Sequence, residues 1–408
     1  MPVKITVALA TTLLAAAVLQ AHAGPAARAA TDFVHQGEHG LAVDIVQRRL
    51  EVRWITREHT RGRLLVLDET GHTLQDVSTR AGRLHTVRVP LPSGPVRLQY
   101  GSRGDATDRH ETRIDPAPPT LSPFALPAVD SLFVVGDTHG ELERLRQLLR
   151  NAGVTDGADR WSAGRAHLVF LGDLMDRGAD VNALLWFVHR LEHEAQRAGG
   201  RVHVVLGNHE LMVFTSDERY VHPKELALAQ LHAKSYGRLF DIRSSILGRW
   251  LASKPGMLQV GDMLMVHGGV SSDWLPYTVG TFNDTLRAFM GEDLFHNWAD
   301  PTFPVTVDSA ALERRNDFFW SERSVFWYRG YVQSDTLRAE LDSVLSRYGV
   351  RTMVVAHTPQ PTMTARYGGD LLAVHPRLPA LEMMLVVREE GSEPRRMRFG
   401  LEGGATTW

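Results

Sequence analysis

Residues from about 40 to 115 alternate apolar and polar positions with a period of two. The apolar positions in the clearest runs are Leu50, Val52 and Trp54, then Val87, Val89 and Leu91, then Val96, Leu98 and Tyr100. Turn-forming residues separate these runs at positions 69–71 and 92–95. Short alternating runs between frequent turns are typical of half-buried strands. The pattern predicts a small all-β sandwich domain over residues 24–115, with no catalytic group of residues in it.

A proline-rich segment, residues 116–130, follows and predicts a semi-rigid linker. After it, apolar strand-like runs alternate with amphipathic helical runs, in the order SLFVVGD, ELERLRQLLRNAG, AHLVFLGD, NALLWFVHRLEHEAQ and RVHVVLGN. Alternating apolar strands and helices predict an α/β fold with a largely parallel sheet. We therefore expect a second domain over residues 131–408, with its ligands beyond the carboxyl ends of the strands.

The first 23 residues have the features of a secretory signal peptide. Lys4 precedes an apolar run at positions 5–19, and Ala21-His22-Ala23 matches an A-x-A cleavage site. The apolar run is short for a membrane span, which favours cleavage over an uncleaved N-terminal anchor. Residues 1–23 thus predict export to the periplasm or beyond, with no stable membrane anchor after cleavage.

Composition narrows the possible partners and the sources of stability. The chain has 408 residues and a formal net charge of −2, and it contains no block of like charges. This balance argues against a surface built to bind nucleic acid. The chain has no cysteine, so neither disulfides nor a lipid-bearing N-terminal cysteine is available.

Metal-ligating side chains stand at the ends of the apolar runs in the second region. They are Asp137, His139, Asp173, Asn208, His267 and His357. Because the carboxyl ends of neighbouring strands meet at one edge of a sheet, we expect these side chains to form a cluster. The cluster offers carboxylate, amide and imidazole donors but no thiolate, a set that suits Mn²⁺, Fe or Zn²⁺ better than Ca²⁺ or Mg²⁺. It has more ligands than one open catalytic metal needs, so two divalent ions are expected.

The ordered motifs GDTHG, GDLMDRG, GNHE and HGG resemble those of the calcineurin-like metallophosphatase superfamily. The Asp-Arg-Gly of the second motif is similar to that of the phosphoprotein phosphatase branch, as are Trp320-Ser321 and the FWYRGY segment at 326–331. The VVAHTPQ segment, together with the N-terminal signal, is closest to bacterial Shewanella-like protein phosphatases. The resemblance covers roughly residues 130–385 and implies a calcineurin-like core of β-sheets flanked by helices, with βαβαβ motifs.

The resemblance also implies a set of metal ligands. The first metal would be held by Asp137, His139 and Asp173. The second would be held by the bridging Asp173 together with Asn208, His267 and His357. Many members of the superfamily have Gly-His-x-His at the last motif, whereas this chain has Ala356-His357-Thr358-Pro359. The absence of the second histidine fits the phosphoprotein phosphatase branch.

The residues assigned to phosphate binding and proton transfer follow from the same resemblance. Arg177 and Arg329 would bind the phosphate oxygens, since a guanidinium matches their geometry. His209, oriented by Asp176, would be the general acid that protonates the leaving group. Glu210 is a candidate to support the ligands, and Tyr328 and His375 are further candidates for substrate contacts.

These features predict a dimetal phosphomonoesterase that acts on a phosphorylated protein or peptide, possibly on phosphotyrosine. Two metals can clamp the phosphate and activate a bridging hydroxide for direct in-line attack, so no cysteine or serine nucleophile is needed. One alternative is a phosphoanhydride hydrolase of the dinucleoside tetraphosphate type, although export to a nucleotide-poor compartment argues against it. The other is an inactive exported binding protein on the same fold.

Overall fold

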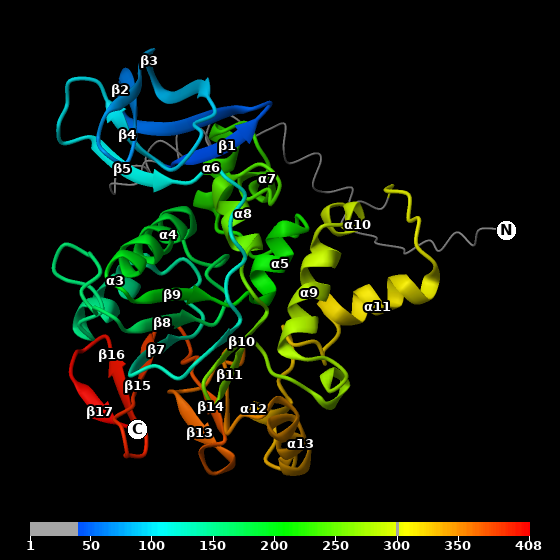
Figure 1. Cartoon of the computed structure of the whole chain (residues 1–408). Helices are drawn as coiled ribbons and strands as arrows, with labels where there is room; N and C mark the ends of the chain where they lie inside the picture. Colours follow the sequence, from blue (N-terminus) through cyan, green and yellow to red (C-terminus); the bar gives the residue numbers. More distant parts are fainter. Residues whose placement is uncertain (1–39, 299–301) are drawn as a thin grey trace.

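The computed structural model describes residues 40–298 and 302–408 of the chain (Figure 1). The predicted signal peptide lies outside the described residues, so export stays a prediction. Three hydrogen-bonded sheets make up the β structure of the described part, one near the N-terminus and two in the larger part of the molecule. Within these two stretches, no helix combines the length and the apolarity that a bilayer span requires.

The N-terminal sheet confirms the predicted all-β region. Its strands are β1 (Ala42–Val46), β2 (Arg49–Leu67), β3 (Thr73–Pro90), β4 (Val96–Ser102) and β5 (Arg109–Ile114). All neighbouring strands are antiparallel, and they form one five-stranded sheet in which β2 pairs with β1, β3 and β4. The prediction was a two-sheet sandwich. The long β2–β3 ladder instead changes register at three places, so a single sheet can curve around its own core.

Strand β1 joins this β domain to the rest of the molecule. The backbone N–H of Ile45 donates to the carbonyl of Ser244 at 2.8 Å. The carbonyl of Leu41 accepts from the Trp186 indole at 2.9 Å and from the Asn182 amide at 3.2 Å. The two parts are therefore in direct contact as well as joined by the chain.

The predicted linker takes part in the larger fold. Its residues Ala125–Leu126 form β6, which pairs in parallel with β10 (Met257–Val260). Earlier in the same segment, the backbone N–H of Ser122 donates to the carbonyl of Ser253 at 3.1 Å. The proline-rich segment is thus an edge strand with fixed flanks.

The first of the two larger sheets contains the predicted βαβαβ unit. Its order is β17 (Ala405–Thr407), β16 (Arg395–Gly400), β15 (Glu382–Val387), β7 (Ser131–Val135), β8 (His167–Phe170) and β9 (Arg201–Val204). Strands β7, β8 and β9 are parallel, whereas β15, β16 and β17 add to the sheet in antiparallel pairs. Parallel strands need crossover connections, which α3 (Leu142–Asn151) and α4 (Val181–Arg197) supply.

The second larger sheet is mixed. Its order is β13 (Thr364–Arg366), β14 (Leu371–Ala373), β12 (Thr352–Val355), β11 (Met263–Val266), β10 and β6. The pairs β11–β12 and β12–β14 are parallel. Strands β11 and β12 therefore point their carboxyl ends to the same edge.

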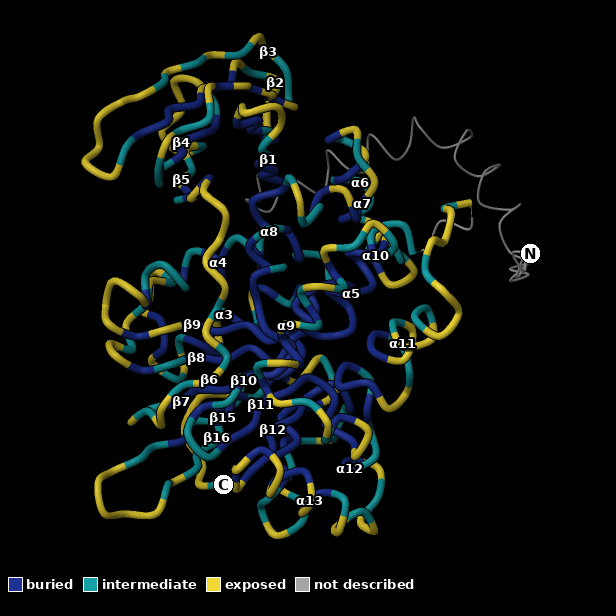
Figure 2. The backbone as a smooth tube through the Cα atoms, turned by 45° about the vertical axis from the view of Figure 1, so that its right-hand side comes forward, coloured by how far each residue is buried: buried dark blue, intermediate teal, exposed yellow. Residues whose placement is uncertain are grey.

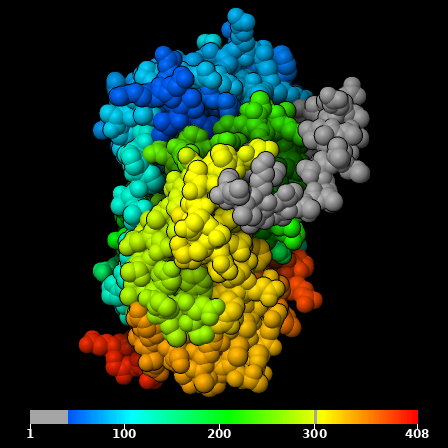
Figure 3. Space-filling model, turned by 90° about the vertical axis from the view of Figure 1, so that its right-hand side faces the viewer, coloured from blue at the N-terminus to red at the C-terminus, as the bar shows by residue number. Residues whose placement is uncertain are grey.

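The remaining helices fill the connections after β9. They are α5 (Asn208–Phe214), α6 (Pro223–Leu231), α7 (Tyr236–Leu239), α8 (Ile246–Ala252), η2 (Ser272–Trp274), α9 (Val279–Met290), α10 (Asp293–His296), α11 (Ser309–Trp320), α12 (Gly330–Gln333), α13 (Arg338–Tyr348) and η3 (Tyr367–Gly369). The segments after β11, coloured yellow-green to orange, form much of one face of the molecule below the blue β domain (Figure 3).

The two larger sheets pack face to face, and helices cover their outer faces. In β7, Leu132 and Val134 belong to the cluster between the sheets, whereas Phe133 and Val135 belong to the cluster shared with the helices. Both faces are apolar, which explains why the strand reads as a continuous apolar run. The buried strands stand out against the exposed loops in Figure 2. The predicted α/β core is confirmed.

Candidate metal centre

The predicted ligands all lie in turns that follow strands of the two facing sheets. Asp137 and His139 follow β7, Asp173 follows β8, Asn208 begins α5 after β9, and His267 and His357 follow β11 and β12. His139, Asp173 and His357 have φ angles of 42°, 52° and 58°. Left-handed backbone is unfavourable for residues other than glycine, and it is retained mainly where function depends on it.

The carboxylate of Asp173 is the centre of the cluster. Its Oδ2 lies 3.3 Å from Nε2 of His267 and 3.7 Å from Nε2 of His139. Its Oδ1 accepts the backbone N–H of His209 at 3.0 Å. Burial alone would raise the pKa of Asp173, but the neighbouring imidazoles hold it well below its usual value. Asp173 is thus an ionised carboxylate within reach of imidazoles from both sheets.

His139 and His267 direct their Nε2 atoms to the interior of the cluster. Nδ1 of His139 lies 2.8 Å from the Met175 carbonyl, and Nδ1 of His267 lies 2.6 Å from the Leu171 carbonyl. These contacts place the ring proton on Nδ1 and leave Nε2 as a potential ligand. Nε2 of His139 and of His357 is buried with no hydrogen-bond partner among the described residues. Buried nitrogens without partners are costly, so the site fits a bound metal.

Burial also keeps two of these imidazoles neutral. It lowers the pKa of His139 to about 4 and that of His357 well below its usual value. Burial would lower the pKa of His267 as well, but Asp173 raises it to about 9. Metal binding requires neutral imidazole, so metal and proton compete at His267.

The cluster contains two groups of potential metal ligands, and within each group the ligand atoms all lie within 4.8 Å of one another. One comprises His139, Asp173 and His209, and the other comprises Asp173, His267 and His357. The groups share Asp173, as two ions bridged by one carboxylate require. Asn208 lies beside the second group, with its Oδ1 2.9 Å from Nε2 of His267. The first group includes His209, which the resemblance assigns as a general acid and not as a metal ligand. The position of its Nε2 is compatible with both roles.

Asp137 is held at both carboxylate oxygens. Its Oδ1 accepts the backbone N–H of His357 at 3.1 Å, and its Oδ2 lies 2.7 Å from Nδ1 of His375 and 3.7 Å from Nε2 of His139. Burial and the charge of Asp173 would raise the pKa of Asp137, but His375 and His267 lower it below its usual value.

His375 was predicted as a possible substrate contact, and the structure places it beside a predicted metal ligand instead. His375 follows β14 just as the predicted ligands follow their strands. The same signal, a polar residue after an apolar run, was therefore present in the sequence. Tyr328, the other candidate, is buried and donates its hydroxyl proton to Glu340 at 3.0 Å.

Glu210 connects two of the ligand-bearing turns. Its carboxylate is fully buried and accepts the backbone N–H groups of Gly207 (2.8 Å), Asp173 (2.9 Å), Leu174 (2.8 Å) and Met175 (3.2 Å). Burial and the charge of Asp173 raise the pKa of Glu210 to about 6. The turns approach so closely that a Cβ at Gly207 would stand 2.3 Å from Oδ1 of Asp173, which requires glycine there.

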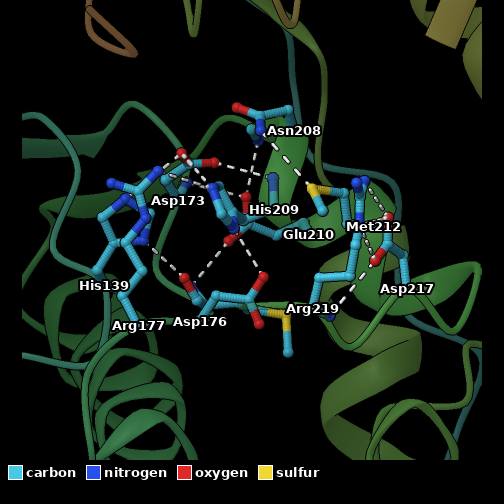
Figure 4. A network of polar contacts seen from close by, with 12 residues as sticks. His139, Asp173, Asp176, Arg177, Asn208, His209, Glu210, Met212, Asp217 and Arg219 are labelled. Atoms are coloured by element: carbon cyan, nitrogen blue, oxygen red, sulfur yellow. Dashed lines mark hydrogen bonds and ion pairs between the residues drawn. The ribbon is translucent and has the colours of Figure 1, made fainter. Parts of the chain in front are cut away.

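His209 and Asp176 form a buried pair beside the cluster (Figure 4). Nδ1 of His209 lies 2.6 Å from Oδ2 of Asp176, while its Nε2 lies 3.8 Å from Oδ2 of Asp173 and 3.1 Å from Nη2 of Arg177. Burial would lower the pKa of His209, but Asp173 and Asp176 raise it above its usual value. Because Asp176 occupies Nδ1, only Nε2 is available to exchange a proton with a substrate.

The two predicted phosphate-binding arginines lie near the cluster. Arg177 is exposed and has a φ of 63°. Arg329 is partly buried, and its Nη1 lies 3.5 Å from the His357 carbonyl. Burial lowers the pKa of Arg329, while Asp137 and Asp173 act in the opposite direction. The carboxylates of the ligand cluster therefore act on the Arg329 guanidinium.

Comparison with known proteins agrees with this geometry. The profile of the calcineurin-like phosphoesterase family matches residues 131–361, more than half of the chain. The chain belongs to this family. The resemblance deduced from the motifs is confirmed.

Three relatives show how far the similarity extends. Shewanella-like protein phosphatase 2 of Arabidopsis thaliana is 27% identical over 276 residues, covering 57% of this chain and 66% of the relative. The symmetrical bis(5'-nucleosyl)-tetraphosphatase of Glaesserella parasuis is 32% identical over 166 residues, covering 39% and 53%. The chain thus spans less than two thirds of the length of these curated relatives. The crystal structure of the cold-active protein-tyrosine phosphatase of a psychrophilic Shewanella species has 26% identity and a TM-score of 0.69, covering 90% of this chain and 97% of that one.

Proposed function

We propose that this chain is a dimetal phosphomonoesterase that hydrolyses phosphorylated proteins or peptides, with phosphotyrosine as the preferred residue. The observation that carries the proposal is the His209–Asp176 pair, joined at 2.6 Å beside a cluster built for metal ions. When a phosphomonoester is hydrolysed, its leaving group departs as an alkoxide or phenoxide that needs a proton. The His209–Asp176 pair is placed to supply this proton.

Each residue then has a chemical task. Asp137, His139 and Asp173 would hold one ion, and Asp173, Asn208, His267 and His357 the other. When bound, two such ions neutralise phosphate charge and activate water for in-line attack. The metals are Mn, Fe or Zn, because the ligands are oxygen and imidazole donors.

The chain's other groups act on the substrate itself. Arg177 and Arg329 would bind phosphate oxygens, since a planar guanidinium matches them. His209 would donate the proton on Nε2 to the leaving oxygen. Asp176 keeps the imidazole oriented and favours its charged form. Both carboxylate and imidazole are buried, which strengthens their interaction.

The preference for phosphotyrosine rests on the extent of the structural similarity. The structural likeness to the cold-active tyrosine phosphatase covers 90% of the chain. In sequence, the match to Shewanella-like protein phosphatase 2 covers 57% of the chain, whereas the match to the tetraphosphatase covers 39%. A dinucleoside tetraphosphate hydrolase is therefore the second candidate. It shares the early motifs but not the remainder of the chain.

Phosphatase activity can be tested on the purified chain. We expect Mn²⁺-dependent release of p-nitrophenol from p-nitrophenyl phosphate, abolished by EDTA and restored by added metal. No metal-dependent release would favour an inactive binding protein instead. A panel of phosphotyrosine peptide, matched phosphoserine peptide and diadenosine tetraphosphate then identifies the substrate class. Preferred cleavage of the tetraphosphate would contradict the proposal.

The role of His209 has a sharper test. His209→Ala should lower kcat by roughly a hundredfold or more on phenyl phosphate while leaving metal content unchanged. The loss should be smaller on p-nitrophenyl phosphate, whose leaving group needs less protonation. His139→Ala serves as the contrast, because it should lose metal. If His209→Ala also loses metal, then its Nε2 is a ligand and not the acid.

A further inference from the structure

Tyr220 is an exposed aromatic residue at the edge of a buried polar site. Its side chain is 48% exposed, whereas His209 and Asp176 are almost fully buried. It lies in the connection between α5 and α6, directly before the buried Val221. An exposed aromatic ring is ordinary by itself. What distinguishes Tyr220 is the set of groups that its ring faces.

The ring of Tyr220 faces the proposed acid. Its centroid lies 5.3 Å from that of the His209 imidazole, with 60° between the ring planes. Asp176 holds Nδ1 of His209, so a leaving oxygen must approach Nε2. The organic group attached to that oxygen is then adjacent to the imidazole. A ring on that group would share the imidazole's surroundings with Tyr220, and aromatic rings attract one another at centroid separations of about 4.5–7 Å.

The position of Tyr220 is fixed by contacts that do not involve its hydroxyl. Its carbonyl accepts the backbone N–H of Arg177 at 2.8 Å. The guanidinium carbons of Arg177 and Arg219 lie 5.9 Å and 5.8 Å from the ring centroid. Arg219 is itself held by both carboxylate oxygens of Asp217. Cations near the ring face restrict its orientation.

We infer that Tyr220 is a specificity-determining residue that packs against the aryl leaving group of a phosphotyrosine substrate. The inference rests on the proposed phosphomonoesterase function and identifies which side chain selects the substrate class. A phosphoserine side chain carries no ring and reaches the same metals without this contact. Aromatic pairing of this kind corresponds to roughly a three- to tenfold preference.

The test compares two peptides that differ only in phosphotyrosine or phosphoserine. The wild type, Y220A and Y220F are assayed with Mn²⁺, and metal content and Tm are recorded for each. Y220A should lower kcat/KM about three- to tenfold on phosphotyrosine, mainly through KM, and less than about twofold on phosphoserine. Y220F should stay within about twofold of wild type on both peptides, because the ring is retained.

Two results would overturn the inference. One is an equal fall on both peptides, which would mean that Tyr220 only supports the Arg177 backbone. The other is an unchanged preference in Y220A. If the metal content or the Tm of Y220A is lower than that of wild type, Y220L provides the same comparison. This variant keeps apolar volume at position 220 but not the ring. Absence of metal-dependent hydrolysis by the wild type is a different result, and it contradicts the proposed function itself.

Discussion

Glu210 in the metal-ligand cluster and Asp44 in the β domain are both almost fully buried carboxylates, but different partners stabilise them. Glu210 accepts four backbone N–H groups. Asp44 is paired with side-chain cations, at 2.6 Å from Nζ of Lys234 and 3.5 Å from Nη1 of Arg53. Burial raises the pKa of both, and the contact with Lys234 opposes that rise at Asp44.

The difference shows what each carboxylate controls. Backbone donors are part of the turns that carry Asp173 and Asn208, so Glu210 fixes the conformation of the ligand turns themselves. Lys234 belongs to the connection after α6, so the pair with Asp44 fixes one part of the molecule against another. Loss of Glu210 should therefore change the chemistry, and loss of Asp44 should change stability.

Replacing Glu210 should have the largest effect. Glu210→Ala leaves four buried N–H groups without an acceptor, each costing about 1–3 kcal/mol. We expect metal affinity to fall by about tenfold to a hundredfold, with a parallel loss of activity. Metal content by mass spectrometry and Mn²⁺ titration of activity would measure this. Normal metal content in the variant would contradict the comparison.

Asp176→Asn should affect the reaction without affecting the metals. The amide keeps the shape of Asp176 but removes the charge that raises the pKa of His209. The protonated acid should therefore be lost at lower pH, so the alkaline limb of the kcat/KM profile moves to lower pH. We expect kcat to fall by roughly tenfold to a hundredfold. A pH profile of kcat/KM, with metal content measured in parallel, tests this. If the alkaline limb does not move, Asp176 does not set the pKa of the group that donates the proton.

Asp44→Asn is the matched change in the β domain. The amide leaves Lys234 without its charged partner, although Arg53 keeps its ion pair with Glu51. This should lower the free energy of unfolding by about 1–3 kcal/mol. Activity and metal content at low temperature should match wild type. Urea unfolding and a p-nitrophenyl phosphate assay together check both statements. A fall in kcat would mean that the β domain influences the site.

Mild acid should also lower the free energy of unfolding, through His232, by a smaller amount. Nε2 of His232 donates to the Gly40 carbonyl at 2.6 Å, and burial lowers the pKa of His232 to about 4. A neutral buried histidine takes up a proton on unfolding, so its stabilising effect is complete above about pH 6.5 and declines below it. At pH 5.5 the loss should be about 1 kcal/mol. In urea unfolding, other buried histidines such as His139 also lower stability at acid pH. The loss between pH 7.5 and 5.5 should therefore be about 1 kcal/mol larger in wild type than in His232→Gln.

Much of the fold and the cluster could be predicted because their signals are local. A polar residue after an apolar run places Asp137, Asp173 and His267 at strand ends whatever the details of the sheets. Which strands pair is not local, so alternation could not distinguish a two-sheet sandwich from one curved sheet. The role of His375 depended on a contact with Asp137 across the fold, and β14 before it is only three residues long.

Other features left no signal because they involve backbone. The four donors to Glu210 are main-chain N–H groups, which every residue but proline possesses. Strand β6 has two residues between Pro123 and Pro127, so its segment reads as a linker. Tyr220 gave no sign of its position either, because its approach to His209 depends on how the connection after α5 folds back.

Strand β6 has a practical consequence for dividing this protein into parts. A chain cut to begin at residue 131 would keep every predicted catalytic residue but would lose the strand that covers β10. The uncovered edge would offer unpaired backbone groups to another molecule, a common route to self-association. A soluble catalytic fragment should therefore begin before Ser122.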